Sequence, residues 1–349
     1  MKQFTLLTIA IGLHCAVQGQ QGVMVKQSAG VSTFIYTSAF LGDDIEAAIA
    51  LCNPLGGDTL ILPGGSFNLT GINNNLLIDR PVVLIGAGYY DPSNLVTTST
   101  VITGLNDVVL LNNADGTSIH GIDFDMNGGS VYFSNAGTQN VSFFRCEFTG
   151  LEFGTTGAGA VNSQIHVQEC VIGSMNGWSA TSVTIDNCVF GSAPQGFFTG
   201  GLTMRNCVVH SWNNASAGAG NSYYNCILMR NGSGTGLAEV SCFNDCLFVC
   251  TSGVMTQGSA TCPSNPVSSG LAGVFDNVTS ITTYSQLFDY GIPNTSPAYA
   301  LDADIYQGPA PWKDGAVPFN AHWTGLTVPG NTNGGLIQNV VIQGQAQSH

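Results

Sequence analysis

Apolar and polar residues alternate in short stretches along the middle of this chain, and the alternating pattern returns about every 20 residues. Its clearest marker is a cysteine that follows a polar residue and precedes an apolar pair, as in Asn187-Cys188-Val189-Phe190. The marker cysteines are Cys146, Cys170, Cys188, Cys207, Cys226 and Cys246. Alternation with a period of two is typical of half-buried strands, and self-similarity at the longer period is typical of a solenoid with one coil per repeat.

The alternation also assigns each column of equivalent residues to the inside or the outside of the coils. The columns three residues before and two residues after each cysteine are apolar, so we expect them to face inward. They contain Phe143, Val167, Ile185, Met204, Tyr223 and Phe243, and Phe148, Ile172, Phe190, Val209, Leu228 and Phe248. Asn187, Asn206 and Asn225, with Asp245, fall at a bend, where asparagine suits left-handed backbone. The predicted fold is an all-β parallel β-helix, and the rule for parallel crossovers makes it right-handed.

The two ends of the chain differ from the repeats. Residues 1–19 have the features of a secretory signal peptide, with an apolar run too short to span a bilayer, and we expect no transmembrane segment. The N-terminal segment, residues 20–57, contains an amphipathic helix from Asp43 to Cys52 that we expect to cap the first coil. The coils are expected over residues 58–262. In residues 263–349 the periodicity fades, which indicates a C-terminal capping region.

Charge is scarce and one-sided. Lys and Arg total 7 against 21 Asp and Glu, which gives a net charge of -14. Nucleic acid and anionic membranes are therefore excluded as partners, because such a chain supplies them with little counter-charge. The expected location is outside the cell, either secreted or on the cell surface.

The cysteines are not read as a disulfide framework, although export would favour one. The six marker cysteines share one inward column, where cysteine serves as a small apolar residue, so we expect free thiols. Cys242, Cys250 and Cys262 lie outside that column, and one disulfide among them remains open.

Two parts of the sequence resemble a known group of proteins. Gly57-Asp58-Thr59, an apolar triplet and Pro63-Gly64-Gly65, followed by the run from Val82 to Gly88, resemble the opening of secreted bacterial right-handed β-helix proteins. The stretches 295–308 and 313–320 are similar to the end of such proteins in Bacteroidetes. The resemblance implies a pectate-lyase-like architecture and a bacterial origin. It specifies function poorly, because relatives include lyases, polygalacturonases, epimerases, tailspikes and adhesins.

The candidate catalytic residues are Asp125, Glu147 and His166. Stacking of coils predicts that Asp125 and Glu147 share an outward column about 5 Å apart, the separation of the two carboxyls in a retaining glycosidase. His166, expected in one column with His120, would act as base or as binder. A calcium ion between the two carboxylates is an alternative use, and no other cofactor or metal is expected. The plainer interpretation is that these acids are solvated and that Asp123, Arg145 and Glu169 form a charge-compensated ladder.

Two further features suggest contact surfaces. The residues directly after the cysteines form an apolar column that alternation turns outward, and we expect either another part of the chain or a partner to cover it. This contact stripe consists of Val171, Val189, Val208, Ile227 and Leu247. Aromatic residues in successive loops, suited to stacking on sugar rings, are candidate ligand-binding residues. They are Trp178, Phe197, Phe198 and Trp212.

Together these features favour a non-catalytic scaffold, secreted or on the cell surface, that binds glycans or neighbouring proteins. A polysaccharide lyase or glycoside hydrolase is the first alternative. The second is a self-assembling surface fibre or adhesin.

Overall fold

The computed structural model describes residues 23–37, 41–69, 75–88, 99–104, 106–134, 137–154, 161–196, 198, 201–212, 221–230, 242–244, 246–250, 267–268 and 274. The expected signal peptide and nearly all of the expected C-terminal capping region lie outside these residues, as do Phe197, Asp245 and Cys262. Among the described residues, no helix is both long enough and apolar enough to cross a bilayer.

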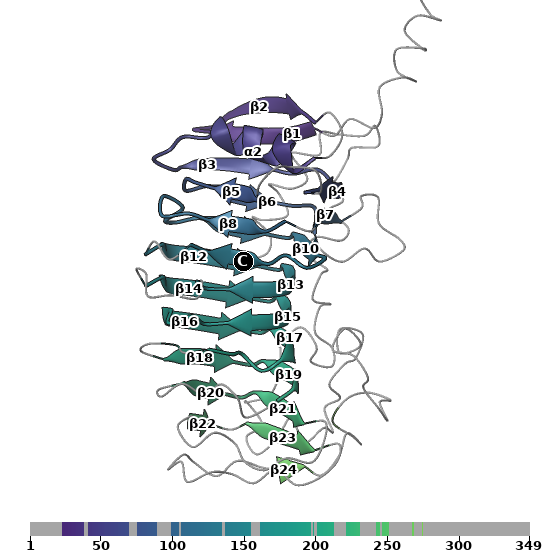
Figure 1. The fold of residues 1–349 in the computed structure, drawn as a ribbon, viewed down its shortest axis with the longest axis vertical. Coiled ribbons are helices and arrows are strands. Elements are labelled where there is room, and N and C mark those ends of the chain that lie inside the picture. Colours follow the sequence, from purple (N-terminus) through teal and green to yellow (C-terminus); the bar gives the residue numbers. More distant parts are fainter. Residues whose placement is uncertain are drawn as a thin grey trace, which may run out of the picture.

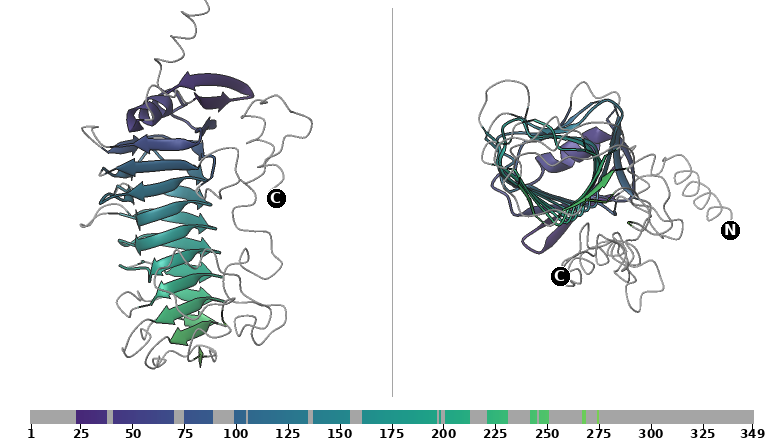
Figure 2. Two further views of the ribbon diagram at one scale, coloured as in Figure 1. Left: turned by 90° about the vertical axis from the view of Figure 1, so that its right-hand side faces the viewer. Right: turned by 90° about the horizontal axis from the view of Figure 1, so that it is seen from below.

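The described part of the chain is a parallel β-solenoid, as the repeat predicted. Figures 1 and 2 show its strands stacked along one axis. One sheet has 11 strands in the order β2-β1-β3-β6-β9-β12-β14-β16-β18-β20-β22. The other has 13 strands, with the path β24-β23-β21-β19-β17-β15-β13-β10-β7-β4 and with β5, β8 and β11 joined beside it.

The first half of the solenoid contains a helix and short strands. They are β1 (Val23–Ser28), β2 (Val31–Tyr36), α2 (Gly42–Ala50), β3 (Asp58–Ile61), β4 (Gly65–Asn68), β5 (Leu76–Ile78), β6 (Val83–Ile85), β7 (Thr100–Gly104), β8 (Val108–Leu110), β9 (Ser118–His120), β10 (Asp123–Met126) and β11 (Val131–Phe133).

The second half contains the regular repeats. Its strands are β12 (Gln139–Phe144), β13 (Glu147–Glu152), β14 (Ser163–Gln168), β15 (Val171–Asn176), β16 (Thr181–Asp186), β17 (Val189–Ser192), β18 (Leu202–Arg205), β19 (Val208–Ser211), β20 (Ser222–Tyr224), β21 (Ile227–Arg230), β22 (Cys242–Asn244), β23 (Leu247–Cys250) and β24 (Val267–Ser268).

The interior is filled by the two apolar columns that the sequence turned inward, and every one of those residues is buried. Equivalent residues on successive coils are in register, as in Val167 opposite Ile185. Rings stack where the columns are aromatic: Phe124 and Phe148 lie 5.1 Å apart and nearly parallel. Full burial of one such side chain contributes roughly 1.5–3 kcal/mol, so the stacked columns are the main source of stability.

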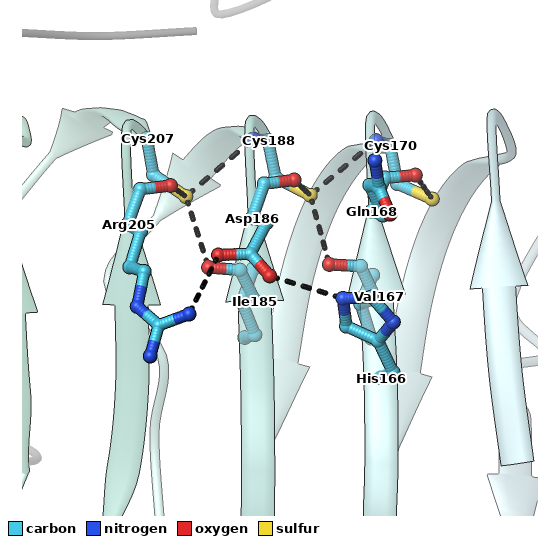
Figure 3. A network of polar contacts seen from close by, with 9 residues as sticks. All are labelled: His166, Val167, Gln168, Cys170, Ile185, Asp186, Cys188, Arg205 and Cys207. Atoms are coloured by element: carbon cyan, nitrogen blue, oxygen red, sulfur yellow. Dashed lines mark hydrogen bonds and ion pairs between the residues drawn. The ribbon is translucent and has the colours of Figure 1, made fainter. Parts of the chain in front are cut away.

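The six marker cysteines are fully buried free thiols in one column, as predicted. Their sulfurs connect successive coils, because the Cys170 N–H donates to Cys188 Sγ at 3.3 Å and the Cys188 N–H donates to Cys207 Sγ at 3.4 Å. The Cys188 thiol in turn contacts the carbonyl oxygen of Asp186 at 3.3 Å (Figure 3). Burial raises the pKa of the Cys188 thiol well above its usual range, which keeps it protonated.

The bend before each cysteine is left-handed. Asn187, Asn206 and Asn225 have φ values of 55°, 52° and 52°, which confirms the expected asparagine bend. Arg145 and Glu169 adopt the same conformation, with φ values of 54° and 53°. The side chains of these two residues form a partly buried ion pair in which Arg145 Nε donates to Glu169 Oε2 at 2.6 Å.

The predicted N-terminal helix is present as α2. It begins at Gly42 and ends at Ala50, two residues earlier than expected. Ile45, Ala48 and Ile49 are buried and belong to the interior cluster. Figure 1 shows the helix beside β1, β2 and β3.

Candidate functional site

The carboxyl pair on the 13-stranded sheet is Asp123 and Glu147, not Asp125 and Glu147. In the parallel register of β10 and β13, Asp123 lies opposite Glu147 and Phe124 lies opposite Phe148. Asp125 instead extends the strand by two residues and is exposed. The expected Asp125–Glu147 pairing is therefore wrong by two positions.

The register differs because the bend of the coil that contains Asp123 lies two residues earlier in the sequence than we expected. Ile122, and not Phe124, is equivalent to Cys146: its carbonyl accepts from the Glu147 N–H at 3.1 Å, just as the Cys146 carbonyl accepts from the Val171 N–H. The bend position of this coil is then Gly121, with a φ of 62°. Asp123 consequently does not share a column with Arg145, and the expected three-residue charge ladder is reduced to the Arg145–Glu169 ion pair.

The paired carboxyls are partly buried, and this changes their protonation. Burial, followed by repulsion from Glu147 and Asp125, raises the pKa of Asp123 to about 8. Burial and the charge of Asp125 raise the pKa of Glu147 to about 7. Near neutral pH the pair therefore retains protons, which makes it a potential general acid. Among the described His, Cys, Asp and Glu side chains, no group of three or more is placed to hold a metal ion.

His166 lies apart from the carboxyl pair. It belongs to β14 in the 11-stranded sheet, whereas Glu147 begins β13 in the other sheet. The proposed set of Asp125, Glu147 and His166 is therefore divided between two sheets. His120 also occupies a different column from His166, since it lies opposite Phe144 while His166 lies opposite Ser142.

His166 takes part in a polar network that spans three coils (Figure 3). Its Nε2 is hydrogen-bonded to Asp186 Oδ2 on the next coil at 3.0 Å. Arg205, one coil further, places Nη1 3.9 Å from Asp186 Oδ1. The His166 and Arg205 side chains are about half exposed, so both present polar atoms to solvent. Asp186 thus fixes two side chains that a ligand on this face can reach.

Asp186 and Arg205 of this network belong to a longer row of outward residues on the 11-stranded sheet, here called the outer row, and His166 stands two residues before its member Gln168. One residue from each strand lies opposite the next, and the row changes from apolar at the β2 end to polar and aromatic beyond β6. Its members are Phe34, Val25, Ile61, Ile85, His120, Phe144, Gln168, Asp186, Arg205, Tyr224 and Asn244. The sequence analysis missed this row, although from Phe144 onward its members all stand two residues before a marker cysteine.

The aromatic members of the outer row are held by their neighbours. The His120 and Phe144 rings lie 5.7 Å apart, and the guanidinium of Arg145 sits 4.8 Å from the centre of the Phe144 ring. Tyr224 is exposed. The row therefore presents flat rings, an amide, a carboxyl and a guanidinium on consecutive coils.

The contact stripe is not exposed. Its five residues are in register on consecutive strands, but none is more than 2% exposed. They do not belong to the interior cluster, so another part of the chain covers them from outside. Of the two alternatives for the stripe, cover by the chain itself fits this burial, and a stripe left open for a partner does not. Glu147 lies opposite Val171 in the same column, which explains why the carboxyl pair is withdrawn from water.

The candidate sugar-binding aromatics are not arranged as a platform. Phe198 is buried and packs over Gly177, where an added Cβ would lie 2.6 Å from its ring. Trp212 is also buried and packs edge-on against Tyr223 at 5.2 Å. Neither Phe198 nor Trp212 has a free ring face for a sugar, so the prediction that these two residues bind a ligand is wrong. Trp178 is partly buried and donates from Nε1 to Glu152 Oε2 at 2.9 Å.

Comparison with known proteins leaves the chain without an assigned family: no protein-family model, no curated protein and no solved structure matches it.

Proposed function

We propose that this protein is a non-catalytic scaffold, secreted or on the surface of a bacterial cell, that binds a glycan or a neighbouring protein along the polar part of the outer row. In this proposal the solenoid is a right-handed β-helix, and α2 caps its N-terminal end. The observation that carries the proposal is the bridge that Asp186 makes between His166 and Arg205, because it holds polar side chains from three coils in one arrangement.

The spacing of the outer row supports an extended ligand. Strands of a sheet lie about 4.8 Å apart, so a ligand lying along the solenoid axis meets a new side chain at each coil. Phe144 and Tyr224 offer faces for stacking, and Gln168 offers amide groups for hydrogen bonds. The side chains are ordered before binding by a rigid backbone, which lowers the entropy lost on binding.

The separation of the predicted catalytic residues supports the non-catalytic part of the proposal. A catalytic acid and its partner base flank one bond of the substrate, whereas Glu147 and His166 lie on different sheets of the solenoid. His166 is instead committed to Asp186.

A binding experiment with a panel of neutral and acidic polysaccharides tests the proposal. We expect the wild-type protein to bind at least one of them, and the double variant Arg205→Ala/Tyr224→Ala to lose at least tenfold in affinity. Leu55→Ala is the matched control, because Leu55 is 89% exposed but lies away from the outer row. Equal binding by both variants, or no binding by the wild type, would contradict the glycan form of the proposal.

The carboxyl pair favours a second candidate function, a glycoside hydrolase centred on Asp123 and Glu147. Two neighbouring carboxyls, of which at least one is protonated near neutral pH, are the groups that such chemistry requires. Release of reducing ends from the same panel, abolished by Glu147→Gln and retained by Asp125→Asn, would establish it. Absence of turnover across the panel would remove it.

A further inference from the structure

The strand β2 forms an exposed edge of the 11-stranded sheet. Among the described strands it pairs only with β1, and it stands at the end of the strand order. Val31, Phe34 and Tyr36 are 65%, 47% and 71% exposed. Figure 1 shows β2 at one end of the solenoid. An edge strand of this kind presents unpaired backbone groups to any second strand.

The hydrogen-bonding direction of each β2 residue follows from its neighbours. The Leu62 N–H donates to Ile85 O at 2.7 Å, so residues of even number in β3 face β6, and Ile61 faces β1. Ile61 lies opposite Val25 in the antiparallel register of β1 and β3. Along β1, the backbone N–H and C=O groups of successive residues point alternately to β3 and to β2. Since Val25 points to β3, Met24 points to β2 and forms its backbone hydrogen bonds with Ile35.

The same alternation leaves Ser32, Phe34 and Tyr36 with their N–H and C=O groups on the free edge. In an antiparallel partner strand, the residues opposite Ser32, Phe34 and Tyr36 must also turn their backbone N–H and C=O groups toward the shared edge. If the partner is another β2, the register centred on Phe34 meets this condition. It places Phe34 opposite Phe34 of the second copy and Ser32 opposite Tyr36.

We propose that two copies of this chain associate through β2, in antiparallel pairing about a two-fold axis at Phe34, so that their 11-stranded sheets join into one. The apolar start of the outer row then continues across the junction, from Ile61 and Val25 through Phe34 of each copy. A ring placed opposite its own copy adds a cross-strand aromatic pair to the new backbone hydrogen bonds.

The distribution of charge on the chain favours β2 as the place where a second copy binds. The chain has a net charge of -14, so two copies repel each other over most of their surface. In a two-fold contact every charged residue near the axis meets the same charge on the other copy. The β2 sequence Val-Ser-Thr-Phe-Ile-Tyr carries no charge, and it lacks the lysine or proline that commonly protects an edge strand.

Sedimentation velocity of the full chain, from micromolar to about 100 µM, tests this pairing. We expect a species of twice the chain mass that is lost in Phe34→Lys, where like charges meet at the axis, and in Phe34→Pro. Because the Phe34 N–H points to the free edge, proline removes a donor to the partner and none to β1. Leu55→Lys is the control that adds the same charge at the same end of the molecule and keeps the dimer.

Cross-linking provides a second measurement that does not depend on loss of a species. Phe34→Cys places two thiols opposite each other, with Cα atoms about 5.5 Å apart, within the range of a disulfide. We expect mild oxidation to give a covalent dimer from Phe34→Cys and none from Leu55→Cys. A wild-type chain that stays monomeric, a dimer that persists in both Phe34→Lys and Phe34→Pro, or an open-ended assembly would overturn the proposal.

Discussion

Glu147 lies directly across from Asp123 on the preceding coil, and next to Val171 on the following one. Two carboxyls thus continue a column of covered apolar side chains. Their raised pKa values, about 7 for Glu147 and about 8 for Asp123, are the electrostatic result of that position.

Stability should fall as the pH rises from about 4 to about 8. A carboxyl whose pKa is higher in the folded protein than in the unfolded chain binds its proton more tightly when folded. Its contribution is therefore complete below the unfolded pKa, near 4 for Asp, and is lost as the pH passes the folded pKa of about 8. Thermal unfolding of the wild type between pH 4 and pH 9 measures the effect.

Asp123→Asn should remove much of that pH dependence and raise the free energy of unfolding at pH 8 by roughly 2 kcal/mol, since the amide carries no charge. Asp43→Asn is the control, because Asp43 is exposed on α2 and is not among the charges that raise the pKa of Asp123, so it should leave the pH dependence unchanged. A pH profile that is identical in the wild type and in Asp123→Asn would show that Asp123 ionises normally.

Val208→Lys should destabilise the protein by roughly 3 kcal/mol or more. Val208 faces outward from the coil but is 2% exposed, so the ammonium group would be placed under the segment that covers it. Urea unfolding gives the measurement. Ser174→Lys, at an exposed position of β15, should cost little. If Val208→Lys folds with wild-type stability, the column is not covered in solution.

Asn206→Ala should cost about 1 kcal/mol, because alanine resists the left-handed backbone that Asn206 adopts. Asn206→Gly should cost less, since glycine has no Cβ to clash in this conformation. The order of the two midpoints in urea is the decisive quantity. A glycine variant less stable than the alanine variant would show that the asparagine side chain, and not the backbone, holds the bend.

The marker cysteines should not react with a thiol reagent in the folded protein and should all react after unfolding. Cys188 and its equivalents are fully buried, so a reagent in solution does not reach their sulfur atoms. Burial also raises the pKa of Cys188, which keeps this residue from forming the reactive thiolate. Cys188→Ala should cost roughly 1 kcal/mol through the small cavity that it leaves. Rapid labelling of Cys188 under native conditions would contradict the buried column.

The sequence was sufficient for what depends on local alternation. The inward positions of Phe148 and Ile185 follow from a period of two within each coil, and the left-handed backbone of Asn187 follows from residue type. The pairing of Asp123 with Glu147 did not follow, because the intervening coil is longer and Gly121 takes the bend position that Arg145 takes in the next coil.

The alternating pattern also could not predict whether an outward-facing side chain is covered by another segment. The period of two correctly turns Val208 outward, but it does not say whether another segment lies above it. For Phe198 and Trp212, loop position suggested exposure, whereas packing against Gly177 and Tyr223 decided their burial.

The column of sulfur atoms has a consequence for how the chain reaches its final form. If the chain is exported, as proposed above, the unfolded polypeptide carries these six thiols and its other cysteines into an oxidising medium, where any two of them are able to join in the wrong order. Each coil that folds onto the preceding one buries the cysteine sulfur of that coil. For an exported chain, rapid folding would therefore limit scrambled disulfides, and a variant that folds slowly should accumulate them.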